Sequence, residues 1–485
     1  MLAEPFGMFR GHISLMHGWI PVAAQIIAFA AVVAAVGWRT PRWRWVALPL
    51  AAVAGALLTL SVKWGITHSG ISGDPAPRQM WVWIFLTGFA SVVAAAGWPS
   101  AQRWRRAVAV AAVPLCALSG ALMLNIWEGY FPTVQSAWSQ LTDGPLPGQT
   151  DQATVNKMLA DRTIPAKGQL VSVNIPATGS NFKHRGEFVY LPPAYFASNP
   201  PPALPAVMMI GGEFNTPADW VRAANAVTTI DNFASHHHGN APVFVFVDSG
   251  GAFNNDTECV NGVRGNAADH LTKDVVPYVI SNFGVSKKAA NWGIVGWSSG
   301  GTCAVDLTVK YPHLFSTFVN IDGDFSPNAG TRQQTVERLY GGSREAYAQW
   351  DPASVIIDQG RYDGVAGWFG VSAPPGSRTH PTAGADLPEF SVGSYPGNPT
   401  AAAKALCRLG SDSGIDCAVV PEPGKHDWPF AARMFAAALP WLASQVGTPG
   451  VPEVALPGTP PPDSRTLAAG AAPQPQHPAV PRASS

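Results

Sequence analysis

One short motif in the sequence has the residue types and spacing of an activated nucleophile. Residues 296–300 read Gly-Trp-Ser-Ser-Gly and so match the pattern Gly-X-Ser-X-Gly. In a nucleophile elbow this pattern holds the serine on a turn so sharp that the flanking positions must be glycine. The apolar run at 292–295 is typical of a buried strand, and the run to Tyr311 favours a helix. We therefore predict that Ser298 is a catalytic nucleophile.

A serine hydroxyl with its ordinary pKa is a poor nucleophile and needs a neighbouring base. In proteins with this elbow the catalytic residues follow the chain order serine, acid, histidine. His426 comes directly after the last expected strand, at 418–420, and directly before the last expected helix, at 430–445. The other histidines after the motif lie at the end of the elbow helix, in a Pro/Gly-rich loop and in the tail: His313, His380 and His477. We predict that His426 is the general base.

The acid of the triad is expected in a loop beyond a buried strand. An apolar run at 355–357 is interpreted as such a strand, and Asp358 and Asp363 follow it. Asp363 lies farther into the loop and is the predicted acid, which would hold the tautomer of the histidine and stabilise its imidazolium form. Asp358 is the rival candidate. Asp322 and Asp324, which follow the preceding strand, are further alternatives.

An oxyanion hole needs two backbone N–H groups beside the nucleophile. The residue after the nucleophile, Ser299, supplies one of them in this type of site. The expected strand at 206–210 ends in Gly-Gly-Glu-Phe, a flexible turn suited to the second. We predict the N–H of Glu213, with that of Phe214 as the alternative.

The elements that must position these residues alternate between strands and helices. Expected strands lie at 170–175, 187–191, 206–210, 243–247, 292–296, 317–321, 355–357 and 418–420. Expected helices lie at 267–283, 300–311, 400–409 and 430–445. Such alternation predicts an α/β fold with a mainly parallel sheet covered on both faces. The first two strands are expected to pair as a hairpin through a turn at 178–185. The catalytic domain is assigned to residues 168–445.

The first 130 residues have a different character. Four apolar stretches, at about 19–38, 43–64, 80–98 and 107–127, are each close to the roughly 20 residues that a helix needs to cross a bilayer. Tryptophans stand near most of their ends, as is typical of the membrane interface. We predict four transmembrane helices. Their interiors lack ionisable groups, so we interpret the region as an anchor rather than a transport path.

The basic residues near the ends of these stretches predict the orientation of the chain. Six arginines lie in the two loops that join the first span to the second and the third to the fourth: Arg39, Arg42, Arg44, Arg103, Arg105 and Arg106. The positive-inside rule places these loops in the cytoplasm. The catalytic domain is therefore expected outside the cytoplasm.

The remaining segments and the composition set further limits. Residues 131–167 are expected to form a linker with a short helical patch at 151–159, and the Pro/Ala-rich residues 446–485 a disordered tail. Lys+Arg and Asp+Glu both number 31, so the zero net charge argues against a nucleic-acid partner. Three adjacent histidines at 236–238 cannot all face one ion, and no metal is expected. Cys407 with Cys417 and Cys259 with Cys303 are possible disulfides; the alternative is free thiols.

Several of these motifs resemble those of a known group of enzymes. Gly-Trp-Ser-Ser-Gly-Gly at 296–301, Ile-Asp-Gln-Gly-Arg-Tyr-Asp at 357–363 and Gly-Lys-His-Asp-Trp at 424–428 are similar to motifs of the esterase D / S-formylglutathione hydrolase-like esterases. The mycolyltransferase antigens of mycobacteria belong to the same broad group. The resemblance covers about residues 168–445 and implies an α/β-hydrolase fold with Ser298, Asp363 and His426 as the triad. It leaves the substrate open, because the group includes thioesterases, carboxylesterases and acyltransferases.

The sequence thus predicts a membrane-anchored serine esterase that hydrolyses an acyl or lipid-like carboxylic ester through an acyl-enzyme. Such a reaction needs no cofactor. One alternative is acyl transfer to a sugar or lipid hydroxyl. A second alternative is an inactive module that keeps the hydrolase fold and only binds a ligand.

Overall fold

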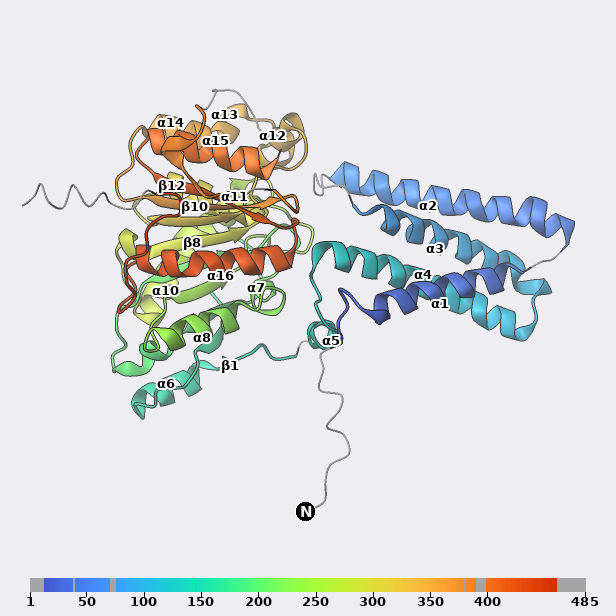
Figure 1. The fold of residues 1–485 in the computed structure, drawn as a ribbon, viewed down its shortest axis with the longest axis horizontal. Coiled ribbons are helices and arrows are strands. Elements are labelled where there is room, and N and C mark those ends of the chain that lie inside the picture. The colour runs from blue at the N-terminus through green and yellow to red at the C-terminus, as the bar shows by residue number, and fades with distance from the viewer. Residues whose placement is uncertain are drawn as a thin grey trace, which may run out of the picture.

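The computed structural model describes residues 13–37, 40–69, 76–142, 144–377, 380–389 and 398–459. It has two parts, a helical bundle and an α/β domain, which stand side by side in Figure 1. The bundle is made of the first four helices, and the α/β domain is built on a ten-stranded sheet.

The bundle consists of α1 (Trp19–Val36), α2 (Leu48–Ser69), α3 (Arg78–Gly97) and α4 (Arg103–Glu128). A π-helical turn (Trp43–Ala47) leads into α2. Among the described residues, four helices are long and apolar enough to cross a membrane, which agrees with the predicted number. The helices alternate in direction, so that α1 begins and α4 ends at the end of the bundle that faces the α/β domain (Figure 1).

The strands of the α/β domain form one sheet in the order β1-β2-β3-β5-β4-β8-β9-β10-β12-β11. Its parallel centre consists of β4 (Ala206–Ile210), β5 (Val243–Val247), β8 (Trp292–Trp297), β9 (Thr317–Ile321), β10 (Ala366–Ala373) and β12 (Asp416–Pro423). The predicted hairpin of β2 (Gln169–Val173) and β3 (Glu187–Leu191) pairs antiparallel and joins β5. Two-residue strands, β1 (Gln149–Thr150) and β11 (Thr382–Ala383), lie at its ends. A separate small hairpin joins β6 (Asn261–Gly262) to β7 (Gly265–Asn266).

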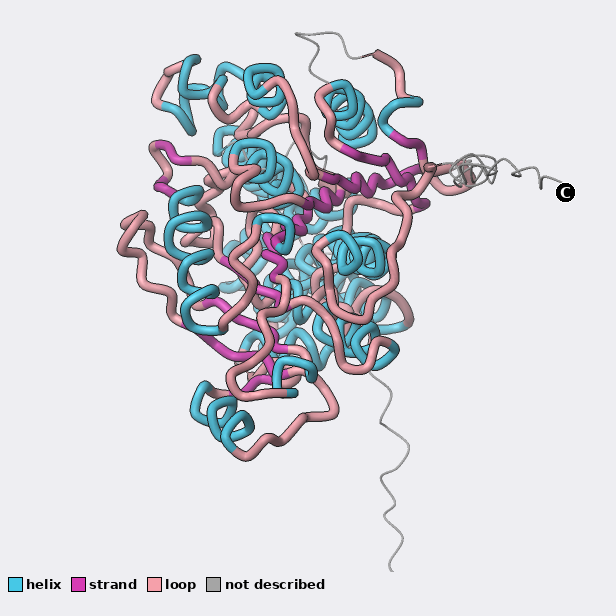
Figure 2. Tube along the Cα trace, turned by 90° about the vertical axis from the view of Figure 1, so that its left-hand side faces the viewer, coloured by secondary structure: helices cyan, strands magenta, loops and turns pink. Residues whose placement is uncertain are grey.

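Helices cover both faces of this sheet, and alternate strand residues point to opposite cores. In β4, Met208 belongs to one buried cluster and Val207 to the other. The first cluster includes α10 (Val276–Phe283), α11 (Ser299–Lys310), α14 (Pro352–Gln359) and α15 (Pro399–Asp412). The second includes α7 (Asp219–Arg222), α8 (Ala226–His236) and α16 (Trp428–Gln445). Figure 2 shows the strongly twisted sheet between helices on either side. This is the predicted α/β-hydrolase fold.

One predicted strand is wrong. The run at 355–357 lies in α14, which begins with Pro352 in its first turn, and the strand of this region is β10. Three apolar residues in a row are equally compatible with a buried strand and with a helix, so their pattern could not distinguish the two. β10 contains Gly367 and Gly370. Because glycine is uncommon in strands, the composition of this segment did not indicate a strand. Gly367 is required by packing, because a Cβ there would meet the ring of Phe318 at 2.0 Å.

The segments predicted as linker and tail are partly built into the α/β domain. The linker contains α5 (Val134–Leu141), β1 and α6 (Gln152–Ala160), and β1 pairs in parallel with β2. Beyond α16, Val451, Val454 and Leu456 pack against the core, so the expectation of disorder is wrong as far as Thr459. The rest of the predicted tail lies outside the described residues.

Two disulfides stabilise the α/β domain. Cys259 bonds to Cys303 on α11, and Cys407 on α15 bonds to Cys417 on β12. Among the described residues Cys116, buried within α4, is the free cysteine. The pairings that the sequence left open are therefore both formed.

Candidate active site

Ser298 lies on a sharp turn between β8 and α11. Its φ of 57° and ψ of −126° are unfavourable for a residue with a side chain, a strain that is common at functional sites. A Cβ at Gly296 would lie 1.7 Å from the carbonyl oxygen of Gly300, and one at Gly300 would lie 2.4 Å from that of Ile210. Only glycine fits at both positions. The local structure is the predicted nucleophile elbow.

His426 faces this serine from the loop between β12 and α16. Its Nε2 lies 3.0 Å from the Oγ of Ser298, which is hydrogen-bond distance. The imidazole stacks on the indole of Trp297, with ring centroids 4.2 Å apart. Asp427 accepts a hydrogen bond from the N–H of Phe430 and so caps α16 directly after the histidine. The stacked indole and the capped helix together hold the ring toward the serine.

The carboxylate beside His426 is that of Asp322. Its Oδ2 lies 3.5 Å from the Nδ1 of the histidine, and the carboxylate is buried. Oδ1 accepts a hydrogen bond of 2.7 Å from the N–H of Ser372 on β10. Asp322 directly follows β9, and its own N–H donates to the carbonyl oxygen of Gly370. This side chain is therefore held between two strands and directed at the imidazole.

The structure corrects the prediction of Asp363 as the acid. Asp363 is exposed and precedes β10, so it lies at the amino ends of the parallel strands, whereas Ser298 and His426 follow carboxyl ends. Asp358 lies in α14. Both predictions depend on a strand at 355–357, and these residues form part of a helix instead. Asp322 carries the signal that should have been preferred, because it directly follows a buried run that does form a strand.

Asp324, the other alternative, interacts with the elbow helix in a different way. Its N–H donates to the Oγ1 of Thr302, and its carboxylate accepts a hydrogen bond from the side chain of Asn328. It does not replace Asp322 in the contact with His426.

The turn that follows β4 runs directly beside Ser298. A Cβ at Gly212 would lie 3.0 Å from the Cβ of Ser298. The N–H of Gly212 donates to the Oδ1 of Asn215, so this amide is occupied, and Glu213 carries the next amide in the turn. Ser299 is the first residue of α11, where an N–H has no acceptor within the helix. The segments that contain both predicted oxyanion donors, Ser299 and Glu213, thus adjoin Ser298.

Arg185 holds this turn from behind, a role that the sequence did not reveal. Its Nη2 donates to the carbonyl oxygen of Asn215 at 2.7 Å and to the Oδ1 of Asp248 at 2.6 Å, while its Nε donates to the Oδ2 of Asp248. Burial alone would raise the pKa of Asp248, but the hydrogen bonds and charge of Arg185 outweigh it and hold that pKa below its usual range. Asp248 directly follows the buried strand β5, and this position was the available signal.

His184, Glu187 and His270 are the described residues whose donor atoms lie close enough for a shared metal ion. Their geometry opposes it. The two rings are stacked 4.2 Å apart and only 20° from parallel, so their in-plane lone pairs cannot converge on one ion. Burial alone would lower the pKa of His270, but the carboxylates of Glu187 and Asp274 outweigh it and raise that pKa. We interpret the cluster as a buried ion-pair network.

The triple histidine at 236–238 also has a structural explanation. The Nδ1 of His236 lies 2.7 Å from the carbonyl oxygen of Asn232, and that of His237 lies 2.8 Å from the carbonyl oxygen of Phe233. Both rings therefore contact the last turn of α8.

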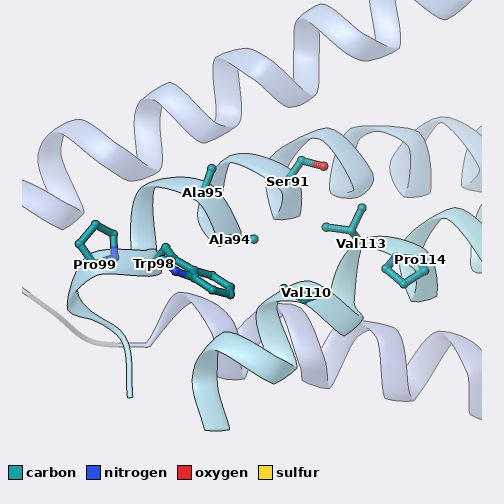
Figure 3. Close-up of a pocket in the computed structure, with 8 residues that line it drawn as sticks. All are labelled: Ser91, Ala94, Ala95, Trp98, Pro99, Val110, Val113 and Pro114. Atoms are coloured by element: carbon teal, nitrogen blue, oxygen red, sulfur yellow. The ribbon is translucent and has the colours of Figure 1, made fainter. Parts of the chain in front are cut away.

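A groove of about 700 Å³ lies between α3 and α4 in the bundle. Trp98, Val110 and Pro114 are among its mainly apolar lining residues, and Ser91 is the polar one (Figure 3). It lies toward the end of the bundle that is remote from the α/β domain, as the positions of Trp98 and Pro99 after α3 indicate. Because its lining includes no titratable side chain, we assign it no chemistry.

Part of the α/β domain is similar to a known family of esterases. Residues 182–382 match the Esterase family model, described as "Putative esterase". An uncharacterized protein of Corynebacterium glutamicum is 26% identical over 445 residues, which is 88% of this chain and 96% of that protein. The matched length exceeds the α/β domain and therefore includes part of the bundle.

Two solved structures are similar to this chain at low identity. An S-formylglutathione hydrolase from Agrobacterium tumefaciens is 16% identical, with a TM-score of 0.44, and the match covers 58% of this chain and 97% of that one. A ferulic acid esterase is 13% identical, also with a TM-score of 0.44, and the match covers 57% of this chain and 99% of that one.

The chain therefore combines an α/β domain that is similar to esterases with an N-terminal bundle of apolar helices. The resemblance to esterases that the motifs indicated is thereby confirmed.

Proposed function

We propose that the protein is a membrane-anchored serine esterase that acts on acyl or lipid-like carboxylic esters outside the cytoplasm. The observation that carries this proposal is the alignment of Ser298, His426 and Asp322. The serine oxygen lies 3.0 Å from one nitrogen of the imidazole, and the carboxylate lies 3.5 Å from the other. Such an arrangement can activate a hydroxyl for attack on an acyl carbon.

The proposed reaction proceeds in two halves. The Oγ of Ser298 attacks the acyl carbon while its proton passes to the Nε2 of His426, and the negative charge on the former carbonyl oxygen faces the amides of Ser299 and Glu213. The bond to the alkoxide breaks as His426 returns the proton to it, which leaves the acyl group on Ser298. Water then attacks with His426 as base, and the acid and free serine are released. Asp322 stabilises the imidazolium in both halves.

Two observations support placement outside the cytoplasm. The six arginines of the expected cytoplasmic loops follow the positive-inside rule. The α/β domain also contains two disulfides, which persist mainly in oxidising compartments.

A fluorophosphonate probe on the full-length protein in detergent micelles tests the proposal. The probe reacts with activated serines, so wild type should be labelled and Ser298→Ala should not. A series of p-nitrophenyl esters of rising chain length then tests hydrolysis directly. Absence of labelling in a folded wild-type protein would refute the proposal in favour of a binding module. Ester formation with an added alcohol, at the expense of the free acid, would favour acyl transfer instead.

A further inference from the structure

Helix α5 has an apolar face that no described part of the chain covers. Val134, Trp138 and Leu141 are 38%, 68% and 78% exposed, and their spacing places them on one side of the helix. On another side, Gln140 donates to the hydroxyl of Tyr130. A capping box at Thr133 fixes the start of the helix. Short amphipathic helices of this kind suit the boundary between water and lipid.

This helix is held at the end of the bundle where spans emerge. It follows α4 after a short turn, and that turn pairs with the segment leading into α1. The N–H of Val134 donates to the carbonyl oxygen of Ile13, and the N–H of Leu15 donates to that of Pro132. Trp19, the first residue of α1, is exposed, as is typical of an indole at the headgroup level. In Figure 1, α5 lies between the bundle and the α/β domain.

The carboxyl edge of the sheet, which carries the candidate site, turns toward the same end of the bundle. Tyr130, directly beyond α4, donates its hydroxyl to the Oδ1 of Asp219 at 2.6 Å. Asp219 begins α7, shortly after the turn beside Ser298, and burial raises its pKa. Gly129 packs on Pro429 so closely that a Cβ on the glycine would lie 2.2 Å from the Cδ of the proline. Pro429 stands three positions after His426.

A further contact and the rim of the site agree with this orientation. Arg338 donates to the carbonyl oxygen of His68 near the end of α2, at 2.6 Å. Phe214, beside the predicted oxyanion donor, contacts Phe253, with ring centroids 5.2 Å apart, and Phe253 is 69% exposed. An aromatic pair with one exposed ring beside a nucleophile suits the acyl chain of a substrate.

We infer that the apolar face of α5 lies in the lipid leaflet where α1 begins and α4 ends, and that this contact holds the candidate site against the membrane. The site then takes an amphiphilic ester directly from that leaflet. The substrate part of this inference rests on the proposed function. Lipid is the occupant that the structure favours, because backbone hydrogen bonds tie the start of α5 to the segment leading into α1, whose own side chains, such as those of Trp19 and Val22, are exposed and apolar.

Site-directed labelling in vesicles tests the membrane contact without reference to activity. Leu141→Cys in the full-length protein would carry an environment-sensitive fluorophore, in vesicles of phosphatidylcholine and phosphatidylglycerol with or without shallow spin-labelled lipid. Ile357→Cys is the matched control, since Ile357 is 46% exposed on α14, far from the bundle in Figure 1. The native cysteines are buried or in disulfides, and unsubstituted protein gives the background.

We expect spin-labelled lipid to quench the fluorophore at position 141 and not at position 357. A label at 141 that aqueous iodide quenches, and lipid does not, would overturn the inference. Cross-linking between labelled chains at 141 would also overturn it, in favour of a second copy as the occupant.

Activity tests the substrate part. In Trp138→Glu/Leu141→Glu, hydrolysis of a short water-soluble ester should stay within about twofold of wild type, while that of a long-chain ester embedded in vesicles should fall by about fivefold or more. Ile357→Glu should change neither rate. Equal falls in both rates, or no fall for the embedded ester, would refute delivery through α5. If wild type hydrolyses neither ester, the proposed function fails, while the labelling result still decides the membrane contact.

Discussion

At the scale of single residues, the candidate site depends on which end of a parallel strand each side chain follows. Asp322 leaves the carboxyl end of β9, the same edge from which Ser298 and His426 emerge. Its carboxylate is buried and fixed by the amide of Ser372. Asp363 carries the same functional group but lies at the opposite edge. Position in the fold, and not residue type, therefore brings Asp322 rather than Asp363 beside His426.

Substitution of the two aspartates separates these assignments. Asp322→Asn should lower kcat for a soluble ester by on the order of a thousandfold or more, because the imidazolium loses its stabilising charge. Asp363→Asn is the matched control and should remain close to wild type. Steady-state kinetics on both variants, with circular dichroism to verify folding, gives the answer. A large loss in Asp363→Asn with an active Asp322→Asn would restore the original assignment.

Arg185 should act as a positioning residue for the oxyanion turn. Arg185→Met removes the hydrogen bond to the carbonyl oxygen of Asn215, so we expect kcat to fall by about tenfold or more with little change in KM. Lys273→Met is the control, since Lys273 forms an exposed ion pair with Asp269. A rise in KM at constant kcat would show instead that Arg185 contributes to substrate binding.

Asp248 predicts an acid-dependent component of stability. The pKa of Asp248 is lower in the folded state than its ordinary value. The carboxylate therefore stabilises the fold above the ordinary aspartate pKa of about 3.9, and this stabilisation is lost as the pH falls through the folded-state pKa. In Asp248→Asn the free energy of unfolding should therefore fall less steeply on acidification than in wild type. Thermal unfolding in detergent micelles over a pH series measures the difference. Parallel curves for the two proteins would contradict the prediction.

At the scale of elements, the two disulfides constrain the chain to different extents. The Cys259–Cys303 bond ties the loop beyond β5 to the elbow helix and closes a loop with a sequence separation of 44, against 10 for Cys407–Cys417. Loop-closure entropy favours the longer crosslink. The first bond should therefore contribute more to the stability of the candidate site.

Paired alanine variants test this difference. Loss of Cys259–Cys303 should destabilise the protein by about 1 kcal/mol more than loss of Cys407–Cys417, on the basis of loop length. It should also slow labelling of Ser298, since Cys303 lies on α11. Thermal unfolding and probe kinetics on both variants supply the comparison. Equal destabilisation would indicate that native packing, rather than loop length, determines the contribution of each bond.

At the scale of the whole molecule, the bundle and the α/β domain are joined by a built interface rather than by a free linker. Tyr130 and Gln140 both face Asp219, with Oδ1 distances of 2.6 Å and 3.5 Å. β1 adds part of the predicted linker to the sheet. Contacts within the chain therefore fix the orientation of the candidate site relative to the bundle.

Cysteine accessibility in intact cells tests the proposed topology. Ile357→Cys, in the α/β domain, should react with a membrane-impermeant maleimide from outside the cell. Ser100→Cys, in the loop between α3 and α4, should react only after permeabilisation. The reverse pattern would place the α/β domain in the cytoplasm and would require a different account of the arginine-rich loops.

Local chemistry in the sequence was sufficient for the elbow, the position of His426, most strands and the four apolar helices. The sharp turn leaves no room for a side chain at positions 296 and 300, so both must be glycine. Buried strands and helices long enough to cross a membrane need continuous apolar residues. Both kinds of feature therefore depend on residues that are close together in the sequence.

Only the tertiary structure decided the rest. The run at 355–357 is compatible with a helix or a strand, so the choice between Asp363 and Asp322 needed the sheet itself. Arg185 contacts Asp248 across 63 positions of the sequence, and Tyr130 contacts Asp219 across 89 positions. Such contacts depend on how distant segments pack, and no local pattern of residues records that packing.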